Sequence, residues 1–124
     1  MEQKFLKCKH CENIVAVVKE NGGVVTCCNH PMEELVAGVV EASREKHIPV
    51  YHVENNIVNV VVGSVVHPMQ EEHYIEWISI HTKQGNQRKC LKPGEKPEAT
   101  FALVDGDEVI SVYAYCNLHG LWRA

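Results

Sequence analysis

The chain has 124 residues, enough for one modest domain or for one domain with a small additional unit. Its 12 basic and 16 acidic residues give a formal net charge of -4, so nucleic acids and anionic membranes are not expected partners. The first residues lack the apolar core of a signal peptide, and no run approaches the roughly 18 apolar residues of a membrane-spanning helix, so we expect a cytoplasmic protein.

The chain is rich in residues that bind metals. It contains six cysteines and eight histidines. In a reducing compartment, cysteines are more often metal ligands or reactive thiols than disulfide partners. The composition therefore favours metal chemistry.

Residues 1–36 are expected to form a small metal domain. A hairpin is predicted over residues 14–25, with Asn21-Gly22-Gly23 as its turn, and it would bring two cysteine pairs together. The four cysteines are Cys8, Cys11, Cys27 and Cys28. A segment this short cannot bury enough surface to fold alone, so the metal would supply much of its folding free energy.

The identity of the metal in this first site is not decided by the spacing alone. Four thiolates are typical of structural zinc, whereas the distortion that adjacent cysteines impose on a tetrahedron favours a redox iron. His10 and His30 lie close to these cysteines, and because four sulfurs complete the shell we expect both to be surface residues.

Residues 37–124 have the pattern of an all-β domain. Six short β-prone runs are separated by Asn, Gly, Pro and Asp, at residues 35–41, 57–63, 74–82, 87–91, 99–105 and 108–115. This number of strands predicts a small antiparallel β-sandwich. No helix of useful length competes, and Pro49 is expected to hold the preceding loop away from helical geometry.

The last predicted strand ends in a cysteine. Ile110, Val112, Ala114 and Cys116 alternate along it, so they should share one buried face. His119 follows three residues later in a loop that ends at Gly120, and its ring can turn back toward the sulfur. A thiolate and an imidazole placed in this way can share a metal.

Three further histidines lie in loops rather than in strands: His47, His67 and His73. Loops at one end of a sandwich cluster in space, so these side chains could converge with Cys116 and His119 on one point. His52 and His81 fall within strand-like runs and are not expected there. Five ligands exceed the four of a structural zinc, while iron accepts five and keeps a sixth position free.

Copper is an alternative metal for this second site. Blue-copper sites use two histidines, one cysteine and a weak axial methionine shortly after the last histidine. Residues 120–124 contain no methionine, and Met69 could reach the site only from a different loop. Copper is therefore disfavoured.

Six motifs can be considered together: the Cys-x-x-Cys and Cys-Cys pairs, Glu45-Lys46-His47-x-Pro49, Gly63-Ser64-Val65-x-His67-Pro68-Met69 with His73, Ile75-Glu76-Trp77, Leu91-Lys92-Pro93-Gly94, and Cys116-Asn117-Leu118-His119-Gly120. Together they resemble desulfoferrodoxin, the two-iron form of superoxide reductase. The resemblance implies a desulforedoxin-like domain with a ferric four-cysteine site. It also implies an immunoglobulin-like sandwich whose ferrous centre has four equatorial histidines, matching His47, His67, His73 and His119, and an axial cysteine, matching Cys116.

The resemblance also implies an activity: one-electron reduction of superoxide to hydrogen peroxide, which serves detoxification, with a rubredoxin-type donor restoring the ferrous state. It implies no haem or flavin, and a homodimer. Lys46 would attract the anionic substrate, and Glu45 would fill the sixth position of the ferric form. Two other hypotheses stay open: a passive electron carrier with a closed second centre, and a zinc-ribbon interaction module. Cys90 is expected to be a buried thiol.

Overall fold

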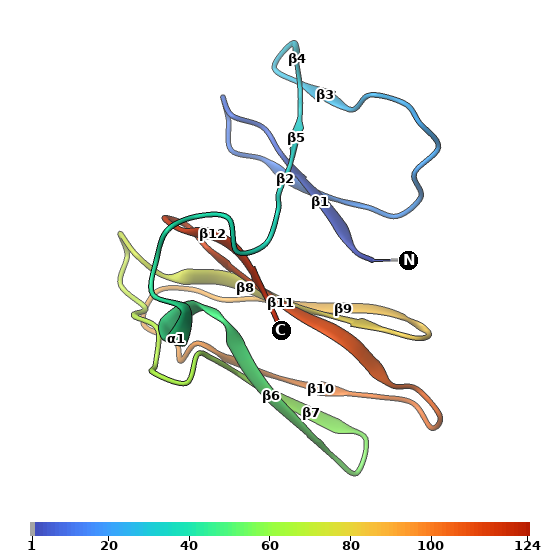
Figure 1. The fold of residues 1–124 in the computed structure, drawn as a ribbon, viewed down its shortest axis with the longest axis vertical. Coiled ribbons are helices and arrows are strands. Elements are labelled where there is room, and N and C mark those ends of the chain that lie inside the picture. The colour runs from blue at the N-terminus through green and yellow to red at the C-terminus, as the bar shows by residue number, and fades with distance from the viewer. Residues whose placement is uncertain (1) are drawn as a thin grey trace. The chain divides into compact units, whose positions relative to one another are not determined.

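The computed structural model describes residues 2–124 (Figure 1), and the chain divides into two compact units, one ending at Val36 and one running from Ala37 to Ala124. Across the described residues, twelve short strands and one helix account for the regular structure, which confirms the predicted all-β class. The helix α1, Arg44–His47, has four residues, too few to cross a bilayer.

The first unit contains two small sheets. Strands β1 (Lys4–Lys7), β2 (Ile14–Val17) and β5 (Glu33–Glu34) form one in the order β2-β1-β5, and β3 (Thr26–Cys27) pairs with β4 (His30–Pro31). Its buried apolar side chains are Phe5, Leu6 and Cys8. So small a core agrees with the expectation that a metal must contribute to folding.

The hairpin predicted over residues 14–25 is wrong. β2 pairs instead with β1, whose Phe5 and Leu6 supply apolar side chains, and residues 18–25 form no strand. The stretch Lys19-Glu20-Asn21-Gly22-Gly23 has almost nothing to bury, so it gains little by pairing.

The second unit is a sandwich of two antiparallel sheets, in the orders β10-β7-β6 and β12-β11-β8-β9 (Figure 1). The strands are β6 (Pro49–Glu54), β7 (Ile57–Val62), β8 (Ile75–Thr82), β9 (Gly85–Cys90), β10 (Glu98–Ala102), β11 (Val109–Cys116) and β12 (Gly120–Arg123). Alternate side chains of both sheets meet in one core, among them Val60, Ile80 and Val112. Each fully buried aliphatic side chain contributes roughly 1.5–3 kcal/mol to the hydrophobic free energy of folding.

One of the six predicted strands does not form, and two strands of the second unit lie outside the six predicted runs. Residues 35–41 form no strand; the chain turns at Gly38, whose φ is +73°, and the Gly38 N–H donates to the Leu121 carbonyl at the edge of β12. Strand β12 was not expected, and β6 was anticipated only as a strand-like run around His52, without bounds. β6 is exposed along most of its length and shows no buried alternation, and β12 has only four residues.

The loop before Pro49 is also different from the expectation, because it forms the short helix α1. The helix ends at His47, and Ile48 is extended (φ -71°, ψ 121°), as the residue before a proline prefers. The proline therefore limits the helix to one turn rather than preventing it. His47, the last residue of α1, is buried.

The predicted buried face of β11 is correct for Val112, Ala114 and Cys116 but wrong for Ile110, which is 47% exposed. An irregularity in the pairing with β8, between Val109 and Ser111, shifts the alternation by one residue, so Val109 packs against the core. The prediction that Cys90 is buried is wrong as well: it ends β9, an edge strand, and is exposed.

Candidate metal centres

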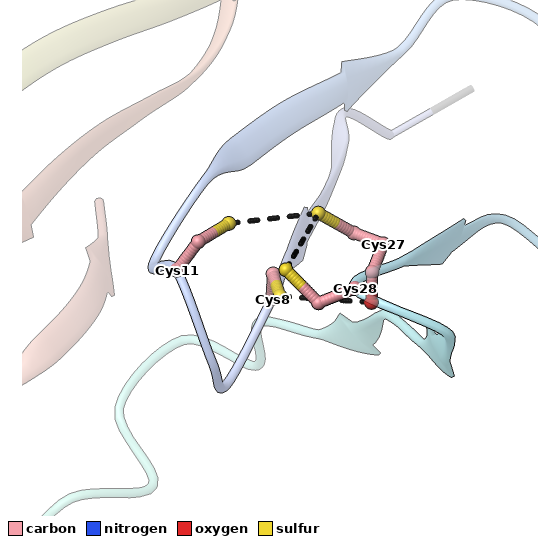
Figure 2. A group of neighbouring side chains, drawn as sticks. All are labelled: Cys8, Cys11, Cys27 and Cys28. Atoms are coloured by element: carbon pink, nitrogen blue, oxygen red, sulfur yellow. Dashed lines mark hydrogen bonds between the residues drawn. The ribbon is translucent and has the colours of Figure 1, made fainter.

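The first cluster consists of the four cysteines of the first unit. Figure 2 shows their side chains gathered around one point, and their sulfur atoms lie within 4.8 Å of one another. The Cys11 and Cys27 sulfurs are 3.5 Å apart, and those of Cys27 and Cys28 are 4.0 Å apart. The sulfurs are close enough together to coordinate one ion.

Local backbone geometry brings adjacent cysteines to the same side. Consecutive side chains of an extended strand point in opposite directions. Cys28 follows β3 and has a φ of +52°, in the left-handed region, so the chain turns there and both sulfurs face the cluster. This conformation costs a residue with a Cβ roughly 1–2 kcal/mol, which metal binding can offset.

Three of the four thiols have a pKa that departs from that of a free cysteine, one downward and two upward. Backbone N–H groups, chiefly that of Cys11, lower the pKa of Cys8 to about 6. The neighbouring Cys11 and Cys8 side chains raise the pKa of Cys27 to about 12, and they raise the pKa of Cys28 as well. A bound metal ion offsets the raised pKa values because it stabilises every thiolate.

The second cluster lies at one end of the sandwich, where loops and strand ends from distant parts of the sequence meet. His47 ends α1, His67 and His73 lie in the connection from β7 to β8, Cys116 ends β11, and His119 lies in the turn before β12. Sγ of Cys116 and ring nitrogens of His47, His67 and His73 lie within 4.8 Å of one another. The His119 Nδ1 is 3.1 Å from the His47 Nε2, so it belongs to the same cluster.

The four imidazole rings form a square. Going around it, the centroids of His47, His67, His73 and His119 are 4.6, 4.7, 5.1 and 4.9 Å apart, and the diagonal from His47 to His73 is 6.3 Å. Neighbouring rings are nearly perpendicular, at 79–86°, and the two rings on that diagonal are inclined by only 29°. Such an arrangement directs four nitrogens toward one centre.

The hydrogen bonds of two of the rings show which nitrogens are free. His47 Nδ1 donates to the Ser43 carbonyl at 2.6 Å, and His67 Nδ1 donates to the Pro68 carbonyl at 2.7 Å. Burial lowers the pKa of both rings, that of His67 to about 4, so they are neutral at pH 7 and carry one proton each. Their Nε2 atoms therefore carry lone pairs.

These two lone pairs face each other, with 3.1 Å between the Nε2 atoms, and no proton is available to join them. The buried Nε2 of His73 likewise has no hydrogen-bond partner. Two nitrogens each about 2.1 Å from an ion, at right angles to each other, lie about 3.0 Å apart. The observed spacing fits equatorial ligands of one metal ion.

Cys116 supplies the fifth donor. It is fully buried, and its sulfur is 3.9 Å from the His119 Nδ1. Burial raises the pKa of the thiol, while backbone N–H groups of His119 and Leu118 act in the opposite direction. The raised pKa keeps the proton on the sulfur at neutral pH, and a bound cation would release that proton by stabilising the thiolate.

Asn117 and Trp122 position the cluster, and neither was singled out for this role from the sequence. The Asn117 side chain accepts from the Tyr74 N–H at 2.9 Å and donates to the Glu72 carbonyl at 3.1 Å, so it joins the His73 segment to the Cys116 turn. Trp122 is buried, its ring centroid is 5.0 Å from that of His47, and its indole N–H donates to the His119 carbonyl. No periodicity in the sequence predicts such contacts. The only signal is that both residues lie within a few positions of a ligand in the sequence.

Gly63 allows the segment with His67 to approach α1. A Cβ built on Gly63 would lie 2.5 Å from the Glu45 carbonyl oxygen. The same oxygen accepts from the Val65 N–H at 2.9 Å and from the Ser64 hydroxyl at 3.2 Å. These contacts set the position of the turn that carries Glu45, Lys46 and His47.

Glu45 and Lys46 are exposed on α1, directly before His47. The Glu45 backbone N–H, the Ser43 side chain and the Lys46 charge lower the pKa of the Glu45 carboxyl, which is therefore ionised at neutral pH. The Lys46 charge also contributes to lowering the pKa of His47 and of His73, although His73 is far away in the sequence. The ammonium group therefore acts on the cluster from nearby.

The residues that the sequence analysis set aside have other partners or are exposed. The Met69 sulfur accepts from the Ile75 N–H at 3.3 Å, so it is engaged and does not act as a copper ligand here. His81 bonds to Asn86, and His52 is exposed in β6. His10 and His30 are exposed, as expected, and their rings stack with centroids 4.4 Å apart.

The fold and its two clusters define a metalloprotein with two separate mononuclear centres, one all-sulfur and one mostly imidazole. The family model for desulfoferrodoxin matches residues 39–124, and that for the desulfoferrodoxin N-terminal domain matches residues 1–35. The chain belongs to the desulfoferrodoxin family. The two centres are accordingly iron sites, one with four cysteines and one with four histidines and a cysteine.

Two individual relatives match this chain over nearly its full length, and a third matches about two thirds of it. The chain is 44% identical to a desulfoferrodoxin of Nitratidesulfovibrio vulgaris, over 99% of this chain and 96% of that protein. The crystal structure of the superoxide reductase from Treponema pallidum is similar with a TM-score of 0.85 and 40% identity, over 100% of this chain and 99% of that chain. A one-iron superoxide reductase from Giardia intestinalis is 36% identical over 64% of this chain and 95% of its own, with a TM-score of 0.55.

Proposed function

We propose that this chain is a superoxide reductase, which combines superoxide, one electron and two protons to give hydrogen peroxide at the second centre. The ligands would be His47, His67, His73 and His119 around the ion and Cys116 as the fifth donor; Cys8, Cys11, Cys27 and Cys28 would hold the first iron. The observation that carries the proposal is the square of four imidazoles with a buried thiol beside it. Five donors leave one octahedral position for a small anion.

Ferrous iron, when bound, supplies the electron and the open position. The protein's residues prepare that position. Backbone carbonyls hold the rings of His47 and His67 in one tautomer, and this orients their Nε2 atoms. The buried sulfur of Cys116 would donate electron density to the bound iron, and the nearby N–H groups would moderate how much it donates.

Lys46 would attract the substrate. Superoxide is an anion and the chain carries a net charge of -4, so a positive side chain beside the centre raises the local substrate concentration. The same ammonium can help deliver protons through water. Glu45 precedes it and would fill the sixth position of the ferric form after the peroxide leaves.

We extend the proposal to the cellular setting. The electron donor would be a rubredoxin-type protein, the role would be detoxification of superoxide in the cytoplasm, and the active form would be a homodimer. Membership of the desulfoferrodoxin family supports these assignments. In the first centre Cys11 and Cys28 are exposed, so a protein donor could approach those sulfurs closely.

The proposal is tested with the purified, iron-loaded chain. Metal analysis should find two irons, and reaction with pulsed superoxide should yield peroxide without dioxygen. Cys116→Ser should retain the first centre but lose the sulfur-to-iron absorption band and most of the activity. Cys90→Ser is the matched control, because that thiol is exposed at the end of β9.

Two outcomes would overturn the proposal. A chain that holds only zinc would favour the interaction-module hypothesis. A second centre whose spectrum does not respond to azide or cyanide would have no open position, and would favour the passive electron carrier.

A further inference from the structure

The two sheets of the sandwich have four outer strands, and three of these are protected. The β12 edge is bonded by the Gly38 N–H, and the edge strand β9 carries the charged side chains of Arg88 and Lys89. At the β10 edge the Gln87 side chain donates to the Ala102 carbonyl, the Glu98 N–H donates to the Lys96 carbonyl, and the inward-facing Phe101 is only 5% exposed. Covered edges and charged edge strands are common ways to prevent pairing with another chain.

Strand β6 has none of these protections. Its sequence, Pro49–Glu54, contains a single formal charge, that of Glu54 at its end. Tyr51 and Val53 pair directly with Val60 and Val58, which are core residues, so their side chains point to the interior of the sandwich. They are nevertheless 36% and 48% exposed. The interior of the sandwich is therefore open along β6.

Within residues 2–124, the backbone of β6 also has unpaired groups on this edge. Asn55 and Asn56 form a two-residue turn with φ values of +50° and +67°, and the pair beside such a turn, Glu54 with Ile57, exchanges backbone hydrogen bonds. Bonded and non-bonded pairs alternate along an antiparallel ladder. The N–H and C=O groups of Tyr51 and Val53 consequently point outward, away from β7.

We propose that β6 pairs antiparallel with β6 of a second copy of this chain, across a two-fold axis at His52. In this register Tyr51 lies opposite the partner subunit's Val53, and all outward N–H and C=O groups of these two residues are paired. An aromatic side chain beside a β-branched one is a favourable cross-strand pair, and it would close the open interior. A strand that can pair with itself satisfies the requirement of a two-fold interface.

Other pairing registers leave more of the outward backbone groups of β6 without hydrogen-bond partners. Centring the pair on Tyr51 would place Val53 opposite the partner subunit's Pro49, which has no N–H to donate. Centring it on Val53 would place Tyr51 opposite the partner subunit's Asn55, whose positive φ is not that of a strand. The inference rests on the proposed homodimer and assigns its contact surface.

The first test compares two matched substitutions in the full, iron-loaded chain. Val50 and Val53 lie in the same strand and are 49% and 48% exposed, but Val50 pairs with Val61 on the outer face. Val53→Lys places a charge in the closed interior and should raise the dimer dissociation constant at least about tenfold. Val50→Lys would face the partner subunit's Glu54 and should not weaken the dimer. Sedimentation velocity over a range of concentrations measures both.

The second test uses cross-linking in a Cys90→Ser background. His52→Cys would place two thiols on the axis, close enough for a disulfide between copies under mild oxidation. Glu54→Cys is the control, because its thiols would be well separated from the axis.

The outcomes distinguish this inference from the proposed function. A dimer that is unaffected by Val53→Lys and not cross-linked by His52→Cys would overturn pairing through β6, while the dimer itself would stand. A wild-type chain that is monomeric at all concentrations would overturn both assignments. The absorption spectrum of the second iron, recorded for each variant, shows whether the variant is folded; if Val53→Lys is not, the cross-linking result decides.

Discussion

Replacing Gly63 with alanine tests how closely the second centre depends on backbone packing around α1. The added Cβ would lie 2.5 Å from the Glu45 carbonyl oxygen, 2.9 Å from the Ile48 carbonyl oxygen and 2.9 Å from the Lys46 carbonyl carbon. Ordinary contacts begin at 3.4 Å, so the shortest of these must open by 3.4 - 2.5 = 0.9 Å. All three atoms belong to the backbone, so no side-chain rotation can relieve the overlap.

A shift of this size moves the turn that carries Lys46 and His47. Misplacement of catalytic groups by about 1 Å typically costs about a hundredfold in rate. We therefore expect Gly63→Ala to lower the rate of superoxide reduction by about 10- to 100-fold and to weaken iron binding at the second centre, while the four-cysteine centre keeps its spectrum.

Stopped-flow kinetics with superoxide and the absorption bands of the two irons measure these effects separately. Gly23→Ala is the control, since a Cβ there meets nothing within 4 Å and its φ is not in the left-handed region. If Gly63→Ala kept the wild-type rate and second-centre spectrum, the argument that this close approach positions α1 would be wrong.

Three further predictions concern single side chains. Lys46→Gln should slow the second-order reduction of superoxide by about tenfold and flatten its dependence on salt, whereas Lys46→Arg should preserve the rate and the salt dependence. Kinetics at varied ionic strength measure both quantities. An unchanged salt dependence in Lys46→Gln would exclude electrostatic attraction of superoxide by Lys46. Asn117→Ala leaves the Tyr74 N–H and the Glu72 carbonyl without their hydrogen bonds to this side chain. The free energy of unfolding, measured in urea, should therefore fall by about 1–3 kcal/mol. No change would refute the role of Asn117 in joining the His73 segment to the Cys116 turn. Burial lowers the pKa of His67 from 6.5 to about 4, so the unfolded state binds more protons between these values. Iron-free protein should therefore be most stable above pH 6.5 and lose stability as the pH falls toward 4. Urea titrations at several pH values measure this, and a free energy of unfolding that rises as the pH falls would contradict the lowered pKa of His67.

The sequence alone predicted the all-β class and the side chains that make up the two metal clusters. The reason is that the chemistry resides in residue type: clustered cysteines, and histidines placed in loops beside Pro, Gly and Asn, indicate metal ligands whatever the register of the strands. Alternation predicted the inner face of β11 from Val112 to Cys116 for the same local reason.

Local reasoning failed where pairing partners decide the conformation. The irregularity beside Ile110 depends on how β11 pairs with β8, and β2 pairs with β1 rather than folding back within residues 14–25. Cys90 was assigned to the core because its run looks strand-like, but an edge strand has too little cover to bury it. None of these outcomes is visible in a short window of sequence.

The residue types and their spacing thus determined the class of fold and the chemistry of two metal sites, because both follow from local properties of the chain. Only the tertiary structure decided that four imidazoles form a square with His47 diagonal to His73, that Asn117 and Gly63 hold the loops in register, and that β6 is the unprotected edge. Those features depend on which distant segments pack together, and packing is a property of the whole folded chain.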